Sequence, residues 1–316
     1  MVKYISIRVV GVFLTLLLFN LVLFYIGRII GMRFRDIPLS DKFIEASGEY
    51  FTYIKNIISE WNWGNDKKDN SAWAILRERS TLTLRLTFLS TITFIFGGIS
   101  LGALAAVYRD SWFDQLINGF ILLFSSIPAF ILVMVLIVVF GYQLEWLPPI
   151  NPSRHILGTW EYLKGFIIPV VSIAGFPMAH IMRLVRGEIV ELYQSDYILL
   201  LRTKGLSTRQ VVVKHFLKDA TVSIFPEIMP MFMYVLVTSF IVEKVYNING
   251  IAKWLFDSIF VPSPGGGYWV VIDLAPMVLL GTFYTFITLF TGLILDIIQV
   301  YMDPRIKLKG KKADGN

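Results

Sequence analysis

The sequence predicts an all-α integral membrane protein with six membrane-spanning helices. Of its 316 residues, 55% are hydrophobic and only 16% are charged, and the mean hydropathy is positive at +0.64. A soluble domain of this length needs more charge to cover its surface. Several apolar runs also reach the length of about 20 residues that crossing a bilayer requires. They alternate with polar stretches, many of them rich in Lys and Arg.

Six apolar segments are predicted to be the spans. They cover approximately residues 5–30, 84–107, 115–141, 163–182, 221–242 and 270–300. Pro128 falls in the middle of the third span and predicts a kink, because a proline leaves a backbone carbonyl unpaired. The fourth span contains Pro169 and Pro177 and is expected to bend. The second span ends in the small-residue run GGISLGALAA, which favours close helix packing.

The polar segments complete a four-part organisation. Residues 1–31 are predicted to be a retained anchor helix, because the apolar run is too long for a signal peptide and no A-x-A site follows. Residues 32–83 form an extracytoplasmic segment, in which Ser40 is expected to cap an amphipathic helix. Residues 84–304 form a five-helix core, and residues 305–316 form a basic cytoplasmic tail. Within the core, NINGIAKWLFDSIF predicts a short external helix, followed by the flexible return SPGGGYW.

The distribution of basic residues predicts that both termini are cytoplasmic. Six spans place the two ends on the same side, and the segments on that side hold most of the Lys and Arg residues. These are Lys3, Arg8, Arg109, the seven basic residues of 183–220, and Arg305, Lys307, Lys309, Lys311 and Lys312. Short loops rich in Lys and Arg remain on the cytoplasmic side. The net charge of +6 therefore reflects membrane topology rather than a nucleic-acid partner.

The cytoplasmic stretch 183–220 predicts a helix–glycine turn–helix element. Two helical runs meet at Lys204-Gly205-Leu206-Ser207, where Gly205 can adopt the left-handed conformation that ends a helix. Ser207 and Gln210 have the spacing of a capping box, so a second short helix is expected to begin there. The stretch is too polar to cross a bilayer. A rigid element that projects between two spans is suited to docking a partner protein.

The motifs of the common catalytic and metal centres are absent. The chain has no cysteine, no G-x-x-x-x-G-K-[ST] phosphate loop, no H-E-x-x-H and no G-x-S-x-G. Its three histidines are scattered, which argues against a metal site. We therefore expect a protein without enzymatic activity that binds no cofactor and no metal of its own.

Four polar residues at membrane depth are the remaining candidates for function. An unpaired carboxylate there costs about 2.5–3.5 kcal/mol on insertion scales, so it is a functional candidate by default. For Glu227 two interpretations stay open, a role in transport or a structural contact with water or a basic neighbour. Asp273, near the outer boundary, is expected to make such a contact. His180 is expected to form an interhelical hydrogen bond, and Asn20 is expected to pack against another helix.

The cytoplasmic stretch and its neighbours resemble the permease subunits of binding-protein-dependent ABC importers. The closest group is the dipeptide/oligopeptide and nickel branch, in its B-type subunit. The family pattern DYVRTARAKGL-S-xx-V-xxxH-xL-xx-A is matched here by Asp196, Tyr197, Arg202, Lys204, Gly205, Leu206, Ser207, Val211, His215, Leu217 and Ala220. Further similar stretches are SLGALAAVYRDSWFD, SIPAF, VEKVYNINGIAKWL and LDIIQVYMDPRIK. One departure is Leu199-Leu200-Leu201, which replaces the small residues of the motif and enlarges the surface offered to an ATPase.

The resemblance implies a six-span permease with the MetI-like core of type I ABC importers. Its partners would be a homologous second permease, two cytoplasmic ATPases that use ATP and Mg²⁺, and an extracytoplasmic binding lipoprotein. The ATPase-coupling residues would be Asp196, Tyr197, Leu199, Leu200, Leu201, Arg202, Lys204, Gly205, Leu206, Ser207 and His215. Glu227, Pro128 and Pro177 are candidate pathway residues. Peptides are the expected cargo, with nickel or another small solute as the alternative.

A proton-coupled secondary transporter is the competing hypothesis. It would use Glu227 or Asp273 as a proton relay and would lose transport when the proton gradient is dissipated with ATP intact. Such transporters commonly carry inverted repeats, which this sequence does not display.

Overall fold

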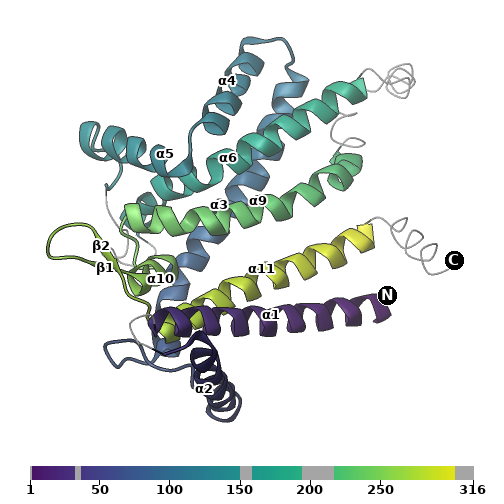
Figure 1. Cartoon of the computed structure of the whole chain (residues 1–316). Coiled ribbons are helices and arrows are strands. Elements are labelled where there is room, and N and C mark those ends of the chain that lie inside the picture. The colour runs from purple at the N-terminus through teal and green to yellow at the C-terminus, as the bar shows by residue number, and fades with distance from the viewer. Residues whose placement is uncertain (1, 33–36, 150–158, 194–216, 303–316) are drawn as a thin grey trace. The chain divides into compact units, whose positions relative to one another are not determined.

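The computed structural model describes residues 2–32, 37–149, 159–193 and 217–302. Helices dominate these residues (Figure 1). The elements are α1 (Val2–Gly31), α2 (Leu39–Glu60), α3 (Ala72–Val107), α4 (Trp112–Ser126), α5 (Ala129–Leu136), the π-helical turn η1 (Ile137–Gln143), α6 (Trp160–Tyr193), α9 (Leu217–Val245), α10 (Ile251–Ile259), β1 (Phe260–Pro262), β2 (Tyr268–Val270) and α11 (Leu274–Met302). The predicted all-α membrane architecture is confirmed.

Five helices in the described part of the chain are long and apolar enough to cross a membrane singly. They are α1, α3, α6, α9 and α11. A sixth crossing would be made by two pieces, α4 and the helix formed by α5 and η1, which meet at an angle of 111°. The predicted third span is therefore not one kinked helix but a broken one. The helix of the second span is also longer than the predicted segment 84–107, since α3 begins at Ala72.

Pro128 explains the break between α4 and α5. The residue before a proline is driven out of the helical region by a clash with the proline ring. Ile127 accordingly has φ −102° and ψ 119°, an extended conformation that ends α4. Pro128 then caps the N-terminus of α5, where its missing N–H leaves no intrahelical bond unmade. By contrast, Pro169 and Pro177 lie inside α6, which continues through both.

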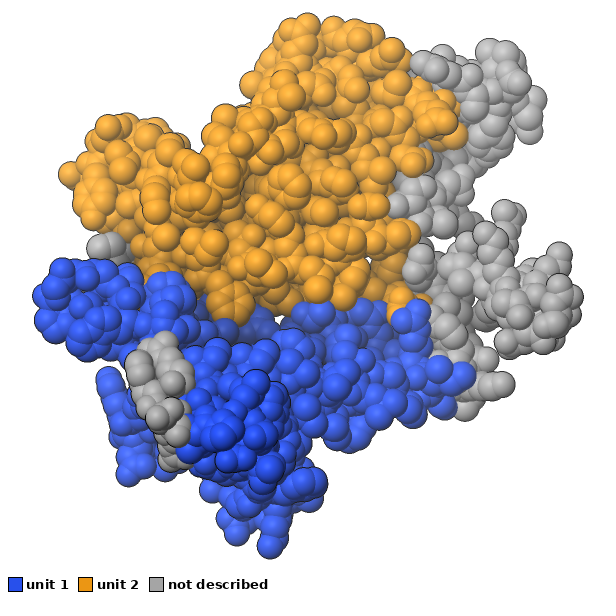
Figure 2. All heavy atoms as spheres, in the orientation of Figure 1, with its two compact units in different colours: residues 1–84, 248–293 blue, residues 85–247, 294–316 orange. Residues whose placement is uncertain are grey.

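The chain divides into two compact units, which Figure 2 colours separately. Residues 1–84 and 248–293 form the first unit, and residues 85–247 and 294–316 form the second. Helix α3 contributes its N-terminal part to the first unit and the remainder to the second. The four-part division predicted from the sequence stays a prediction.

In the first unit, α2 packs against α1 through aromatic side chains. Phe24 and Tyr50 are buried together with Val278 of α11, and their rings are 5.2 Å apart. Asn20 donates to the Thr282 hydroxyl of α11 at 2.9 Å, which confirms that Asn20 packs against another helix. Arg28 of α1 pairs with Glu49 of α2. The amphipathic helix in this segment is therefore confirmed, but Ser40 is not its cap: Pro38 occupies that position and the Ser40 hydroxyl bonds Asp41 instead.

A short hairpin follows α10 in the same unit. β1 and β2 pair antiparallel, with Phe260 opposite Val270. Gly266 and Gly267 have φ values of +85° and +81° at the tip, a region that glycine adopts without steric cost. The segment SPGGGYW, predicted as a flexible return, is thus partly ordered as a hairpin. The predicted external helix is present as α10 and begins after Gly250.

Helix α6 is the central helix of the second unit. It packs against α4, α5 and α9. Of its most apolar window, 72% is buried, against 11–28% for the other four single spans. The glycines of α3 allow the same helix to approach α3 closely. A Cβ placed on Gly102 would lie 2.7 Å from the Met182 carbonyl oxygen, so the predicted small-residue packing is confirmed.

Replacing Gly102 with Ala should therefore destabilise the second unit. The added methyl group meets backbone atoms that cannot move independently, and overpacking of this kind costs about 1–3 kcal/mol. Gly119→Ala in α4 is the control, since a Cβ there meets nothing within 4 Å. Thermal unfolding in detergent should show a lower midpoint for Gly102→Ala alone. Equal midpoints for the two variants would contradict the close approach of α3 and α6.

Candidate functional site

The predicted coupling residues lie outside the residues that the structure describes. Asp196, Tyr197, Leu199, Leu200, Leu201, Arg202, Lys204, Gly205, Leu206, Ser207 and His215 all fall between residues 194 and 216. The two flanking helices are described: α6 extends to Tyr193, and α9 begins at Leu217. The contacts that hold α6 and α9 in the second unit therefore determine where this segment begins and ends.

An ion pair joins α6 to α4. The Arg186 guanidinium donates from Nε and Nη2 to the two carboxylate oxygens of Asp114, at 2.7 and 2.8 Å. Asn118 adds a hydrogen bond to the Asp114 Oδ1 atom at 3.0 Å, and the Asp110 amide donates to Oδ2 at 3.1 Å. The Asp114 side chain is only 4% exposed and that of Arg186 is 25% exposed. A bidentate pair of this kind sets both the distance and the orientation of the two helices.

This pair was not predicted from the sequence. Arg186 was expected only as one of the cytoplasmic basic residues of 183–220. Asp114 lies in the first turn of α4, where Ser111 caps the helix and accepts a bond from the Asp114 amide at 3.3 Å. The sequence Ser111-x-x-Asp114 carries the capping signal that would have placed Asp114 inside the helix. Nothing in the sequence spacing indicated Arg186 as its partner, because the two lie 72 residues apart.

A second polar contact joins α6 to α9. His180 Nε2 lies 2.9 Å from Glu227 Oε2, which confirms the interhelical hydrogen bond expected for His180. The two side chains are 36% and 39% exposed, so neither is enclosed by this chain alone. Glu227 lies about one helical turn inside the apolar segment Ile224–Val245. Charged side chains at such positions normally face a helix bundle or a water-filled path rather than lipid.

The other candidate pathway residues have different surroundings. Pro177 is buried in α6. The ring of the neighbouring Phe176 packs at a tilt against that of Tyr234 in α9, with centroids 4.8 Å apart. Pro128 lies at the break between α4 and α5. Both prolines shape the helices in which they lie, and no contact in the described part of the chain ties them to a transport path. The prediction that Pro128, Pro177 and Glu227 line the path therefore stays a prediction.

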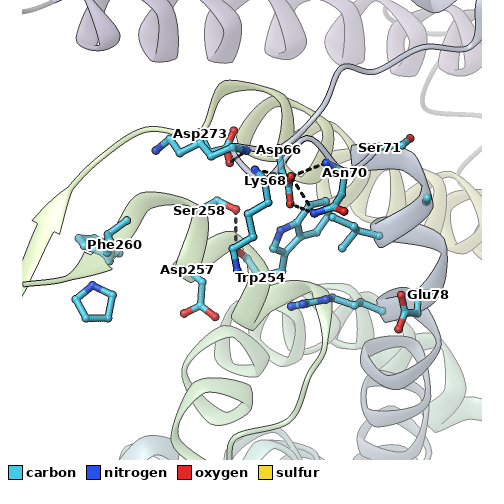
Figure 3. A pocket seen from close by; sticks show the side chains of 16 residues that line it. Asp66, Lys68, Asn70, Ser71, Glu78, Trp254, Asp257, Ser258, Phe260 and Asp273 are labelled. Atoms are coloured by element: carbon cyan, nitrogen blue, oxygen red, sulfur yellow. Dashed lines mark hydrogen bonds between the residues drawn. The ribbon is translucent and has the colours of Figure 1, made fainter.

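The first unit contains a cleft of about 970 Å³, here called the hairpin cleft. Figure 3 shows Asp66, Lys68 and Asn70 of the loop before α3 together with Trp254 and Asp257 of α10. The loop closes on itself, because Asp66 Oδ1 accepts from the Lys68 and Asn70 amides, each at 2.9 Å. The Arg79 guanidinium lies 6.0 Å from the centre of the Trp254 ring, within range of a cation–π contact.

Asp273 anchors the loop before α3 to the segment that enters α11. Its Oδ2 atom accepts from the Lys67 amide at 2.9 Å, while the Lys67 Nζ atom donates to the Val271 carbonyl at 3.1 Å. Burial raises the pKa of Asp273, and the opposing effect of Lys67 does not cancel it. Burial also lowers the pKa of Lys67. The expectation that Asp273 sits at a span end and contacts a basic neighbour is confirmed.

Among the described residues, no group of acidic or histidine side chains could hold a metal ion.

Replacing Asp114 with Asn should destabilise the second unit by up to about 3–5 kcal/mol, the usual cost of leaving one member of a buried pair without its partner. The double variant Asp114→Asn/Arg186→Gln should lose less stability than the sum of the two single variants. Asp110→Asn is the control, because its side chain is 83% exposed and its pair with Arg109 contributes little. Unfolding midpoints in detergent measure all four variants. Additive effects would show that Arg186 and Asp114 do not act together.

Comparisons with known proteins place the chain in a family. Residues 98–308 match the family described as binding-protein-dependent transport system inner membrane component. The dipeptide transport system permease protein DppB of Lactococcus lactis subsp. cremoris is 27% identical, and the alignment covers 98% of this chain and 100% of that protein. DppB of Bacillus subtilis is 29% identical over 83% of this chain and 80% of the relative. The oligopeptide permease OppB of Haemophilus influenzae is 27% identical over 82% and 80%.

The solved structures agree with the fold. A chain of the MetNI methionine ABC transporter, in an inward-facing conformation, superposes with a TM-score of 0.56 at 16% identity. The superposition covers 73% of this chain and 97% of that one, which confirms the predicted type I importer permease fold. The resemblance to the dipeptide and oligopeptide branch of ABC importer permeases is likewise confirmed by its relatives. This chain therefore belongs to the family of binding-protein-dependent transport system inner membrane components.

Proposed function

We propose that this chain is the permease subunit of an ATP-driven importer, forming half of a translocation path for peptides delivered by an extracytoplasmic binding protein. The observation that carries the proposal is the match to a dipeptide permease over 98% of the chain, the whole length of that relative. The names of the relatives favour peptides over nickel or another small solute as cargo. ATP hydrolysis, with its Mg²⁺, takes place on a partner chain, and this chain supplies no cofactor site.

The proposed assembly pairs this chain with a homologous second permease, two cytoplasmic ATPases and a binding lipoprotein. The exposure of His180 and Glu227 supports a second permease. A polar pair about one-third exposed and about one turn inside an apolar helix requires a neighbour other than lipid. A second permease, or a water-filled path between the two permeases, would provide it. Glu227 would then face the path from the α6–α9 side.

The proposed coupling step uses the segment between α6 and α9. ATP-driven closure of the ATPases would push on residues 194–216, which connect the inner ends of the two helices. Because α6 is tied to α4 by Arg186 and to α9 by His180, a push on that connection would move the three helices together. The broken crossing at Pro128 gives α4 and α5 separate axes, so α5 need not follow α4 rigidly.

The proposed orientation places both termini and the coupling segment in the cytoplasm of a bacterial cell, with the hairpin cleft outside. Its support is the concentration of Lys and Arg in residues 183–220 and in the C-terminal tail.

The coupling role predicts a selective defect for Gly205→Asp. A carboxylate introduced into the docking surface would be buried without a partner, so retention of the ATPases should fall by more than about tenfold. Membrane insertion should be unchanged. Gly265→Asp is the matched control, because Gly265 lies in the hairpin loop, where a Cβ meets nothing within 4 Å. Co-purification from mild detergent, with peptide uptake in parallel, measures both variants.

Two outcomes would contradict the proposal. If Gly205→Asp retained the ATPases as well as Gly265→Asp does, the coupling role would be wrong. If uptake persisted without ATPases and disappeared with the proton gradient, the chain would be a secondary transporter that uses Glu227.

A further inference from the structure

The second unit contains a pocket of about 510 Å³ between α4 and α6 that none of the roles above uses. The volume lies within the range of small-molecule sites, about 300–1,000 Å³. The lining combines polar and apolar side chains. It consists of Asn118, Ile121 and Leu122 from α4 and of Arg183, Arg186 and Gly187 from α6.

The two arginines leave hydrogen-bond donors available in this pocket. Arg183 donates from Nη2 to the Ser125 hydroxyl at 3.1 Å, and it has no carboxylate partner among the described residues. Arg186 uses Nε and Nη2 for Asp114, so its Nη1 atom makes no bond within the described part of the chain. The Asp114 carboxylate neutralises Arg186, which leaves the charge of Arg183 uncompensated. The pocket therefore carries one net positive charge and a set of oriented guanidinium donors.

The surroundings of the pocket are those of a lipid-facing surface. Leu122 is 65% exposed, and Leu116, Phe120 and Leu123 of the same helix are exposed as well. Arg183 and Arg186 lie two to three turns before Tyr193, the last described residue of α6, and they begin the stretch 183–220 that the sequence predicts to be cytoplasmic. A phosphate held there would have its glycerol and acyl chains against Ile121 and Leu122. Basic pockets between membrane helices at this depth bind anionic headgroups.

We propose that this pocket binds the headgroup of an anionic phospholipid, with the phosphate on Arg183 and Arg186 Nη1 and the acyl chains on the exposed face of α4. The exposed apolar side chains of α4 beside the pocket favour a lipid over a soluble anion, because only a lipid has acyl chains that would cover them. The ligand is independent of the cargo and of the ATPases. Arg183 would thus hold α4 and α6 together through the lipid, beside the direct contact made by Arg186.

Lipid retention by the purified permease, together with any partners that co-purify, tests the proposal. Native mass spectrometry would compare dioleoyl phosphatidylglycerol with dioleoyl phosphatidylcholine, which differ only in headgroup. The wild-type protein should retain the anionic lipid preferentially. Arg183→Gln should weaken that retention by roughly tenfold, the effect of losing one charge-assisted hydrogen bond. Arg77→Gln removes the same charge from an exposed site on α3 and should have no effect.

A second pair of variants leaves every arginine in place. Gly187 lines the pocket, and a Cβ there meets nothing within 4 Å, so the side chain of Gly187→Leu should occupy the pocket and expel the lipid. Gly119→Leu adds the same side chain to an open position of α4 outside the lining. Unfolding midpoints confirm that each variant is folded.

Three results would overturn the proposal. The first is equal retention of the two lipids by the wild-type protein. The second is undiminished retention by Gly187→Leu. The third is displacement of the anionic lipid by millimolar inorganic phosphate, which would identify a site for a soluble anion instead.

Discussion

The second unit depends on one constraint: a charged or polar group that is buried between helices or lies within a bilayer has to find its partner within the protein. Helix α6 satisfies it twice. Arg186 pairs with the carboxylate of Asp114 on α4, and His180 bonds Glu227 on α9. These contacts select particular neighbours for α6, whereas apolar packing alone would tolerate many arrangements. The glycines of α3 act by a different means. Because they have no side chain, the backbone of α3 can lie directly against α6.

The same contacts connect the fold to the proposed function. Helices α6 and α9 flank the segment 194–216, and polar contacts join α6 to α4 and α9 to α6. A force applied to the segment would reach α4 through Arg186 without an intermediate flexible loop. The anionic lipid proposed for the neighbouring pocket would add to this link, because its phosphate would contact Arg183 and Arg186 while its chains cover α4.

Local rules of sequence accounted for most of the elements. The spans follow from apolar length, the break at Pro128 from the restriction on Ile127, and the bond of Asn20 from the need to satisfy an amide among apolar side chains. Contacts between segments that are distant in the sequence could not be predicted in this way. The Asp114–Arg186 pair joins residues 72 positions apart, and no periodicity links them. Ser40 failed as a cap because Pro38 begins the helix earlier. The family resemblance, rather than any spacing, indicated the function of residues 194–216.

The sidedness of the α6–α9 connection tests the central claim most directly. The natural sequence has no cysteine, so each introduced thiol is the only one in the chain. Ser207→Cys, in the proposed coupling segment, and Lys68→Cys, in the loop of the hairpin cleft, would be treated with a membrane-impermeant maleimide in intact spheroplasts. The account predicts that Lys68→Cys is labelled at once and Ser207→Cys only after lysis. Labelling of Ser207→Cys in intact spheroplasts would contradict the coupling of this chain to cytoplasmic ATPases.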